Sequence, residues 1–189
     1  MEHFSKIFPW LQLWISPRKM LRTLLDTNPR YCFHRMLFFS GMGLVAAFNA
    51  MFSLPVLLVV LLLTSWPVGF IYNSVQGWIL TYMGRIFNGQ GRFEEVRIAC
   101  LWSSFPITLG SIITFGINRY AFAQQNPPSP IYALIGMVAL TASVWGFFTF
   151  IFMVAESHKI SAWRAFFTIF LTSLIFVAVF MLITNIFQG

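Results

Sequence analysis

Long uncharged stretches dominate the pattern of polar and apolar positions along this chain. The longest runs from Met36 to Gly84 and holds 49 residues without Asp, Glu, Lys, Arg or His. Three more follow at Ile98–Asn118, Tyr120–Ala155 and Ala165–Gly189. A helix rises about 1.5 Å per residue, so the first stretch alone would extend about 73 Å, enough to cross a hydrocarbon core of about 30 Å twice. The pattern predicts a protein built into a membrane.

Prolines and short polar connections divide these stretches into five spans. We therefore expect an all-α integral membrane protein with five transmembrane helices preceded by an amphipathic interfacial N-terminal helix. The expected spans cover residues 36–53, 56–82, 102–121, 131–155 and 165–187. Residues 36–189 would form one five-span membrane domain, and residues 1–35 a basic amphipathic segment at the cytoplasm or the interface. The second span is long, so we expect it to tilt or bend near Pro67.

A short basic helix is predicted directly before the first span. Ser16-Pro17 suits a helix start, with serine at the N-cap and proline at the first helical position, and Asn28-Pro29 suits its end. Its apolar stripe consists of Met20, Leu21, Leu24 and Leu25. A basic amphipathic helix here is typical of a segment lying in the membrane interface, and packing beneath the bundle as a brace is the alternative. The candidate lipid-interface residues are Trp10, Trp14, Arg18, Lys19 and Arg22.

The distribution of charge predicts the orientation of the chain. Eleven of the twelve Lys and Arg residues fall before the first span or in the connections after the second and fourth spans. Only Arg119 falls on the other side. By the positive-inside rule, the N-terminus is expected in the cytoplasm and the C-terminus on the opposite side. The net charge is +7, but the basic residues lie between apolar spans rather than on a soluble surface, so no nucleic-acid partner is expected.

Composition supports a small membrane domain without ion-pumping chemistry. The chain is 58% hydrophobic and 9% charged, with a mean hydropathy of +0.77, whereas soluble domains are about 25% charged. No Asp, Glu, Lys or Arg lies at the centre of a span, which argues against a proton pump or a channel with a charged filter. Asn49 and Asn73 are candidates for hydrogen bonds between spans. The small-residue spacing Gly43-x-x-x-Ala47 would permit close helix packing or a homo-oligomer.

Glu156 is the candidate interaction residue at the end of the fourth span. It follows an apolar run directly, and a carboxylate at the membrane boundary is costly unless it is paired. An ion pair with Arg85 or Arg97 is the leading expectation. A proton or substrate role is the alternative.

The loop after the second span contains two glycines and leads into an acidic helix start. Gly89-x-Gly91 is not expected to hold a phosphate, because no Lys-Ser or Lys-Thr follows and no strand precedes it. The glycines are expected to supply a sharp turn with positive φ. Glu94 and Glu95 suit the first turn of a helix, where the dipole favours negative charge.

No catalytic, cofactor or metal constellation stands out. Cys32-x-His34 and His158 do not have the spacing of a zinc site, so no metal or cofactor is expected. A Ser/His/Asp or Cys/His arrangement is also missing from the sequence pattern. An enzyme acting on a lipid stays as a minor alternative, and it would require Glu156, His158 and Arg85 to cluster at the cytoplasmic rim.

The order of several motifs resembles a known family. Tyr82–Val96 combines a glycine-rich loop with a Phe-x-Glu-Val helix start, and Trp102–Pro106 is a small-residue stretch that ends in proline. Together with Ser16-Pro17-Arg18, Asn28-Pro29 and Ser161-x-x-Arg164-Ala165, this order resembles the prokaryotic branch of the Yip domain family, the Ypt/Rab-interacting proteins. The family-motif and candidate interaction residues are Arg85, Gly89, Gly91, Phe93, Glu95, Pro106 and Glu156.

The resemblance implies a five-span helical domain in a cell inner membrane, with a cytoplasmic N-terminus. Eukaryotic members are linked to vesicle trafficking through small GTPases. That role is not carried over, because those members have a long N-terminal region with an acidic-aromatic motif and this chain has about 35 basic-rich residues there.

The sequence thus predicts a non-enzymatic membrane-organising or interaction protein with a basic cytoplasmic face. Its expected partners are the lipid bilayer and anionic phospholipids, together with a cytoplasmic protein or a second copy. The alternative is a small transporter or lipid-translocating protein, oligomeric, with a groove lined by Ser, Thr and Asn.

Overall fold

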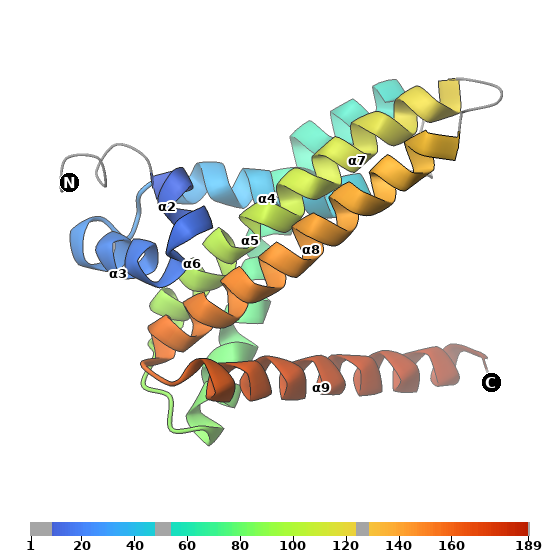
Figure 1. The fold of residues 1–189 in the computed structure, drawn as a ribbon. Coiled ribbons are helices and arrows are strands. Elements are labelled where there is room, and N and C mark those ends of the chain that lie inside the picture. Colours follow the sequence, from blue (N-terminus) through green and yellow to red (C-terminus); the bar gives the residue numbers. More distant parts are fainter. Residues whose placement is uncertain (1–8, 48–53, 124–128, 189) are drawn as a thin grey trace.

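The computed structural model describes residues 9–47, 54–123 and 129–188, and all regular secondary structure in these ranges is helical (Figure 1). The helices are α2 (Pro9–Ile15), α3 (Pro17–Thr27), α4 (Phe33–Ala47), α5 (Leu54–Ile86), α6 (Phe93–Ser103), α7 (Phe105–Ala123), α8 (Ser129–His158) and α9 (Ala162–Gln188). The predicted all-α class is therefore confirmed for this part of the chain. Asn49 lies outside the described residues.

Helices α4 to α8 form the body of the fold, with α4 and α6 joining α5 to α7 and α8. α7 and α8 pack along one another, α4 packs against both α5 and α7, and α6 packs against α5 and α8. The short helices α2 and α3 lie at one end of the body, where α3 contacts α8 (Figure 1). The N-terminal segment is thus attached to the bundle through its own helices.

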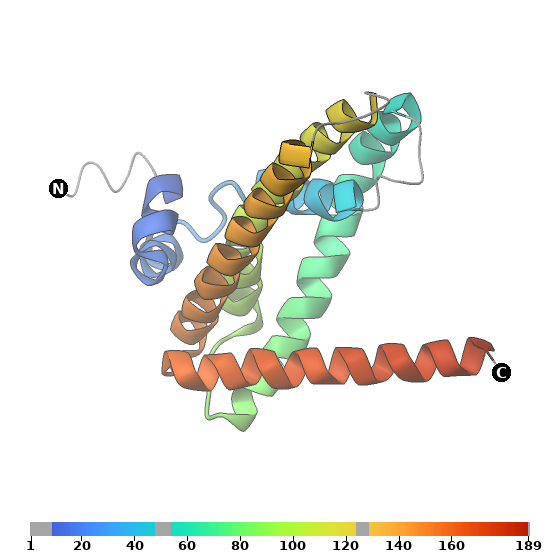
Figure 2. The ribbon, with the colours of Figure 1, turned by 45° about the vertical axis from the view of Figure 1, so that its right-hand side comes forward.

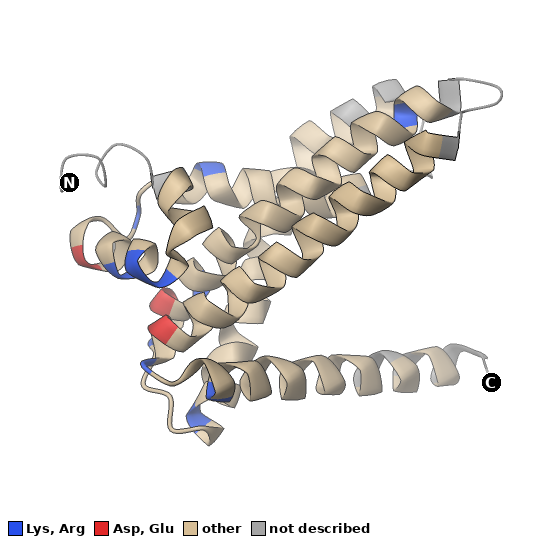
Figure 3. Ribbon diagram, in the orientation of Figure 1, with Lys and Arg blue, Asp and Glu red and all other residues tan. Residues whose placement is uncertain are grey.

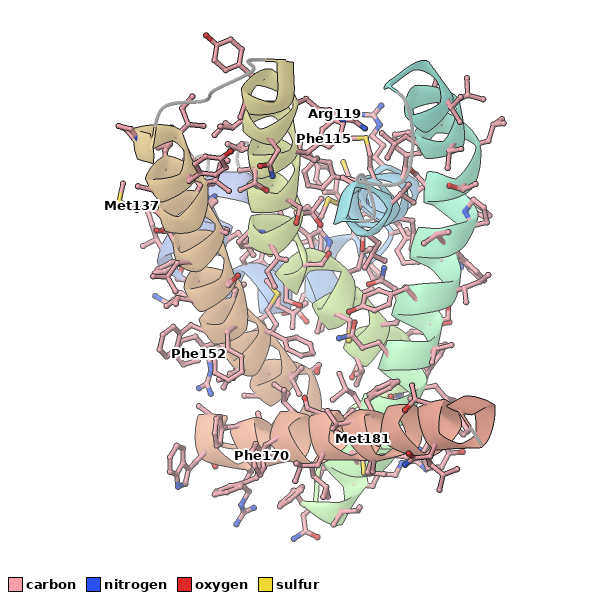
Figure 4. All side chains as sticks on the ribbon, turned by 90° about the vertical axis from the view of Figure 1, so that its right-hand side faces the viewer. Phe115, Arg119, Met137, Phe152, Phe170 and Met181 are labelled. Atoms are coloured by element: carbon pink, nitrogen blue, oxygen red, sulfur yellow. The ribbon has the colours of Figure 1, made fainter. Side chains whose placement is uncertain are left out.

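Helix α9 diverges from the other helices. Its first half packs on α5 and α8 and buries Ala165, Thr168 and Ile169. Its second half runs away from the body, as Figure 2 shows, and Figure 4 labels Phe170 and Met181 along it. Met181 is 60% exposed. Such apolar exposure over a long helix is compatible with hydrocarbon rather than water around it.

Three helical stretches of the described residues are long and apolar enough to cross a membrane. They cover Val59–Ile86, Phe93–Ala121 and Pro130–His158. A shorter apolar helix covers Ala162–Ala178. The membrane class is supported by these stretches, and the expectation of five crossings stays a prediction.

The third predicted span differs most from the structure. Its first residues, Trp102 and Ser103, belong to α6, and α7 begins only at Phe105. Pro106 accounts for this break, because proline has no N–H to donate to a preceding turn and suits the first positions of a helix. The other predicted spans lie inside α4, α5, α8 and α9, apart from residues 48–53, which the structure does not describe.

The apolar stripe of the N-terminal segment is buried inside the protein. Met20, Leu21 and Leu24 join a core cluster with Met36 of α4 and Trp102 of α6. Proline is at the first position of α3, as predicted, but the Ser16 side chain makes no capping hydrogen bond. This packing corresponds to the brace alternative, and contact of the same helix with lipid stays a prediction.

Helices α4 and α5 approach each other at backbone distance. A methyl group on Gly41 would overlap the carbonyl oxygen of Ser65 and lie 2.9 Å from the backbone nitrogen of Gly69. Beside this contact, Nδ2 of Asn73 donates to Oγ of Ser40 at 3.1 Å, and both side chains are buried. The predicted interhelical hydrogen bond of Asn73 is confirmed. Small residues and a buried polar bond are typical of helix contacts in membranes.

Candidate functional site

Basic residues gather at one end of the molecule, around α3, the α5–α6 loop and the α8–α9 connection (Figure 3). We call this region the basic end; its described members are Arg18, Lys19, Arg22, Arg30, Arg35, Arg85, Arg92, Arg97, Lys159 and Arg164. Arg119 lies near the opposite end of α7, with its guanidinium 5.5 Å from the Phe115 ring (Figure 4). The charge separation along the sequence is therefore also a separation in space.

The glycine loop begins with a tight helix ending at the basic end. The N–H of Gly89 donates to the carbonyl of Gly84 at 2.8 Å, which closes the last turn of α5 in a Schellman-type pattern. Asn88 takes the left-handed conformation with φ of 62°. The expectation of positive φ at Gly89 and Gly91 is wrong, because neither glycine has it. Asparagine tolerates this conformation well, so the turn does not need glycine for its φ.

Helix α8 ends in the same way, directly against this loop. Lys159 has φ of 55°, and the N–H of Ile160 donates to the carbonyl of Ala155 at 3.0 Å. The N–H of Gln90 donates to the carbonyl of His158 at 3.0 Å. This single backbone hydrogen bond joins the two helix ends and holds the glycine loop against α8.

The glycines are needed because the loop wraps around the imidazole of His158. The ring is fully buried, and a methyl group would lie 2.6 Å from Nδ1 if built on Gly89 and 2.8 Å if built on Gly91. A methyl group on Gly84 would overlap the ring itself. The Leu80 carbonyl faces the ring, yet among the described residues neither ring nitrogen has a well-formed hydrogen bond. Three glycines therefore make room for one histidine.

Glu156 is paired with the N-terminal segment rather than with a loop arginine. Nε of Arg22 donates to Oε1 of Glu156 at 2.7 Å, and the two side chains form an ion pair. The expected partners Arg85 and Arg97 are wrong. The Arg22 side chain is 71% exposed and that of Glu156 is 14% exposed. The bond ties α3 to the end of α8, two residues before the enclosed His158.

We predict a small coupling energy between Arg22 and Glu156. Because the arginine is mostly in solvent, screening should limit the pair to about 0.5 kcal/mol. The variants Arg22→Gln and Glu156→Gln and their combination should each lower thermal stability slightly in detergent. A double-mutant cycle measures the coupling. A value of about 2 kcal/mol or more would contradict this account and indicate a desolvated pair.

Arg97 sits in a box of aromatic rings at the start of α6. Its guanidinium lies 4.9 Å from the Phe33 ring, 5.3 Å from Phe93 and 5.8 Å from Phe70. Nε of Arg97 is buried and has no hydrogen-bond partner among the described residues. The family-motif residue Phe93 thus supports an arginine, which the sequence pattern alone did not indicate.

The remaining motif residues at the basic end have structural contacts. Oε2 of Glu95 accepts a hydrogen bond from the N–H of Arg92 at 3.2 Å, which caps α6. Glu94, in the same turn, is exposed. The guanidinium of Arg85 lies 5.4 Å from the Tyr82 ring. The predicted placement of Glu95 at a helix start is therefore confirmed.

The expected lipid-interface residues spread along α2 and α3. Trp14 stacks on Trp145 of α8 with ring centroids 5.9 Å apart, and the guanidinium of Arg18 lies 5.5 Å from the Phe152 ring. Figure 4 labels Phe152 on α8, toward the basic end of that helix. Lys19 is exposed, and the side chain of Trp10 lies outside the described part.

The two histidines His34 and His158 lie in different surroundings. His34 stacks on Trp66 with ring centroids 6.2 Å apart, whereas His158 is enclosed by the glycine loop. The sequence pattern showed the glycine spacing but did not indicate that these glycines make room for the ring of His158. Nothing in the sequence linked positions 84, 89 and 91 to a residue about 70 positions later.

Comparison with known protein families gives a match. A family model described as the Yip1 domain matches residues 11–183, from α2 into α9. No curated protein and no solved structure matches the chain. The matched range includes the glycine loop, the Arg22–Glu156 pair and the α6–α7 break at Pro106. With its apolar helices and this match over nearly its whole length, the chain belongs to the Yip1 domain family of membrane proteins.

Proposed function

We propose that this protein is a non-enzymatic membrane-organising or interaction protein whose basic end binds anionic phospholipid headgroups. The observation that carries the proposal is the concentration of Lys and Arg at one end of an otherwise apolar helical body. Basic clusters next to membrane helices attract anionic lipid by about 1 kcal/mol per residue near the surface. The same end would offer a surface to a cytoplasmic protein or a second copy.

The pairing of charges at the basic end supports this proposal. Among the described residues, one ion pair within 4.0 Å is found, Arg22–Glu156. Most of the basic side chains at the basic end therefore have no described acidic partner at that distance. Lys19, Arg30 and Arg164 are exposed. Such cations are stable when they face water and phosphate groups together. The proposal also includes an inner-membrane location, which the resemblance to the Yip domain family suggests, and a cytoplasmic basic end, which the positive-inside rule suggests.

A charge-removal experiment tests the proposal. In Arg18→Gln/Lys19→Gln/Arg22→Gln, we expect weaker retention of phosphatidylglycerol by the purified full chain, by about tenfold or more for three charges. Native mass spectrometry, with phosphatidylglycerol and phosphatidylcholine of matched acyl chains, measures the bound lipid. Arg119→Gln is the control, because it removes one charge at the opposite end. Unchanged retention in the triple variant would contradict the proposal.

A second candidate function, lipid translocation, is favoured by a groove between α5 and α9. The groove has a volume of about 850 Å³ and is mostly apolar. Its polar contributors are Tyr72, Gln76, Thr172 and Ser173. A lipid chain fits such a surface better than a polar solute. Transfer of fluorescent lipid between leaflets in liposomes carrying the protein, compared with empty liposomes, separates this function from the first.

A further inference from the structure

A second charged feature lies at the basic end, apart from α3. A pocket of about 290 Å³ opens between the start of α4 and the first turns of α6. The residues that line it include two arginines, a histidine and a glutamate: Arg30, Arg97, His34 and Glu94. None of these side chains takes part in the Arg22–Glu156 pair or in the cage around His158. The pocket therefore needs its own explanation.

No described carboxylate lies within 4.0 Å of the Arg97 guanidinium. Aromatic rings surround its guanidinium, and its buried Nε has no hydrogen-bond partner in the described part of the chain. Although Glu94 lines the same pocket, no ion pair within 4.0 Å joins the two described side chains. A partly desolvated guanidinium without an anion is costly, so a ligand that brings one would be stabilised here.

The charges in the pocket match a ligand with two opposite poles. Arg30 and Arg97 can both donate hydrogen bonds to phosphate oxygens, since guanidinium suits that geometry. A ligand carrying phosphate alone would leave Glu94 unpaired beside it. A primary ammonium close to the phosphate gives Glu94 three donors to accept from. The pattern favours a phosphate and a primary ammonium in one small headgroup.

An exposed apolar stripe on α5 leads away from this pocket. Trp66 stacks on His34 and, at 5.6 Å, on Phe70, whose ring lies beside Arg97. The stripe continues on the same helix face through Leu62 and Val59, which are 69% and 55% exposed. Because α5 ends at the basic end, these residues lie progressively deeper along the helix. Acyl chains attached to a headgroup in the pocket could follow this stripe.

We propose that this pocket binds the phosphoethanolamine headgroup of a phospholipid, with its phosphate on Arg30 and Arg97 and its ammonium on Glu94. The inference rests on the proposed function in one respect, the placement of the basic end at a membrane surface. It adds a specific lipid class and a site away from α3. Phosphatidylcholine should bind less well, because its methylated ammonium has no N–H to donate to Glu94.

Lipid selectivity of the purified full chain tests this inference. Native mass spectrometry with phosphatidylethanolamine, phosphatidylcholine and phosphatidylglycerol of identical chains should show about tenfold preference for phosphatidylethanolamine over phosphatidylcholine, the effect of one charge-assisted hydrogen bond. Glu94→Gln should remove that preference while leaving phosphatidylglycerol retention equal or higher. Glu94 is exposed, so this variant should fold.

Two arginine variants complete the experiment. Arg30→Gln and Arg97→Lys should each lower retention of phosphatidylethanolamine about tenfold. Arg119→Gln, which removes a charge near the opposite end of α7 and outside the pocket, should leave it unchanged. Arg30 is exposed, so its effect does not depend on the fold of the aromatic box.

Several results would overturn the inference. Equal retention of phosphatidylethanolamine and phosphatidylcholine by the native chain would do so, as would an unchanged preference in Glu94→Gln. Glycerophosphoethanolamine that competes as strongly as the lipid would assign the site to a soluble ligand instead. Failure of the proposed function has a different signature, since retention of phosphatidylglycerol would then be unchanged in the α3 triple variant while Glu94→Gln still lost its selectivity.

Discussion

Replacing Gly41 with alanine is expected to force α4 away from α5 and to cost about 3 kcal/mol of stability, the upper part of the range for overpacked cores. The added methyl group would overlap the carbonyl oxygen of Ser65, which is backbone and has no rotamer through which to move aside. Separation would also stretch the buried hydrogen bond between Asn73 and Ser40. Thermal unfolding of the purified protein in detergent, followed by loss of helical circular dichroism, measures the effect.

Gly136→Ala is the matched control for this substitution. Gly136 also lies inside a long helix, but nothing approaches the position where its methyl group would be within 4 Å. Alanine there should be neutral or stabilising by up to about 1 kcal/mol, because it favours the helical backbone. If Gly41→Ala melts at the same temperature as the native chain and as Gly136→Ala, the close α4–α5 contact is wrong.

Replacing Gly84 with alanine is expected to cost about 2 kcal/mol, because the new methyl group would overlap the buried ring of His158. The ring has little room to turn away, since Gly89 and Gly91 enclose it from the loop side. Loss of this packing should loosen the junction between the ends of α5 and α8. The melting temperature and the rate of proteolytic cleavage in residues 87–92 both report the change.

A double-mutant cycle with His158→Ala makes this prediction specific. His158→Ala alone leaves a cavity and should also destabilise the protein, by about 2 kcal/mol. When the ring is absent, the methyl group of Gly84→Ala enters free space, so the combined loss should fall at least about 1 kcal/mol short of the sum. Additive losses would mean that the glycine loop does not enclose the histidine.

The sequence pattern anticipated those parts of the fold that depend on local chemistry. Uncharged runs located the long helices, Asn28-Pro29 located the end of α3, and Asn73 was identified as an interhelical donor. Each of these follows from properties of neighbouring residues. The small-residue spacing at Gly43 was also visible in the sequence. Within the chain, Gly43 packs closely against Thr108 of α7.

The candidate site was less predictable because its contacts join distant positions. Glu156 was recognised as a carboxylate needing a partner, but Arg22 lies 134 positions away and no spacing rule connects them. Several arginines were equally plausible from sequence, and only the docking of α3 on α8 decides among them. The prediction for the glycine loop failed for a related reason. A glycine in a loop can indicate either a positive φ or a close approach of another group, and only the packing of His158 in the structure distinguishes the two.

The most direct test of the central claim, that the basic end binds anionic phospholipid, is a measurement of lipid selectivity in a bilayer. The full chain is reconstituted in phosphatidylcholine with a trace of spin-labelled phosphatidylglycerol or phosphatidylcholine. Electron spin resonance then gives the fraction of each label that is held at the protein. The account predicts a larger held fraction for phosphatidylglycerol than for phosphatidylcholine, lost in Arg18→Gln/Lys19→Gln/Arg22→Gln and kept in Arg119→Gln. Equal fractions for both lipids in the native chain would contradict it.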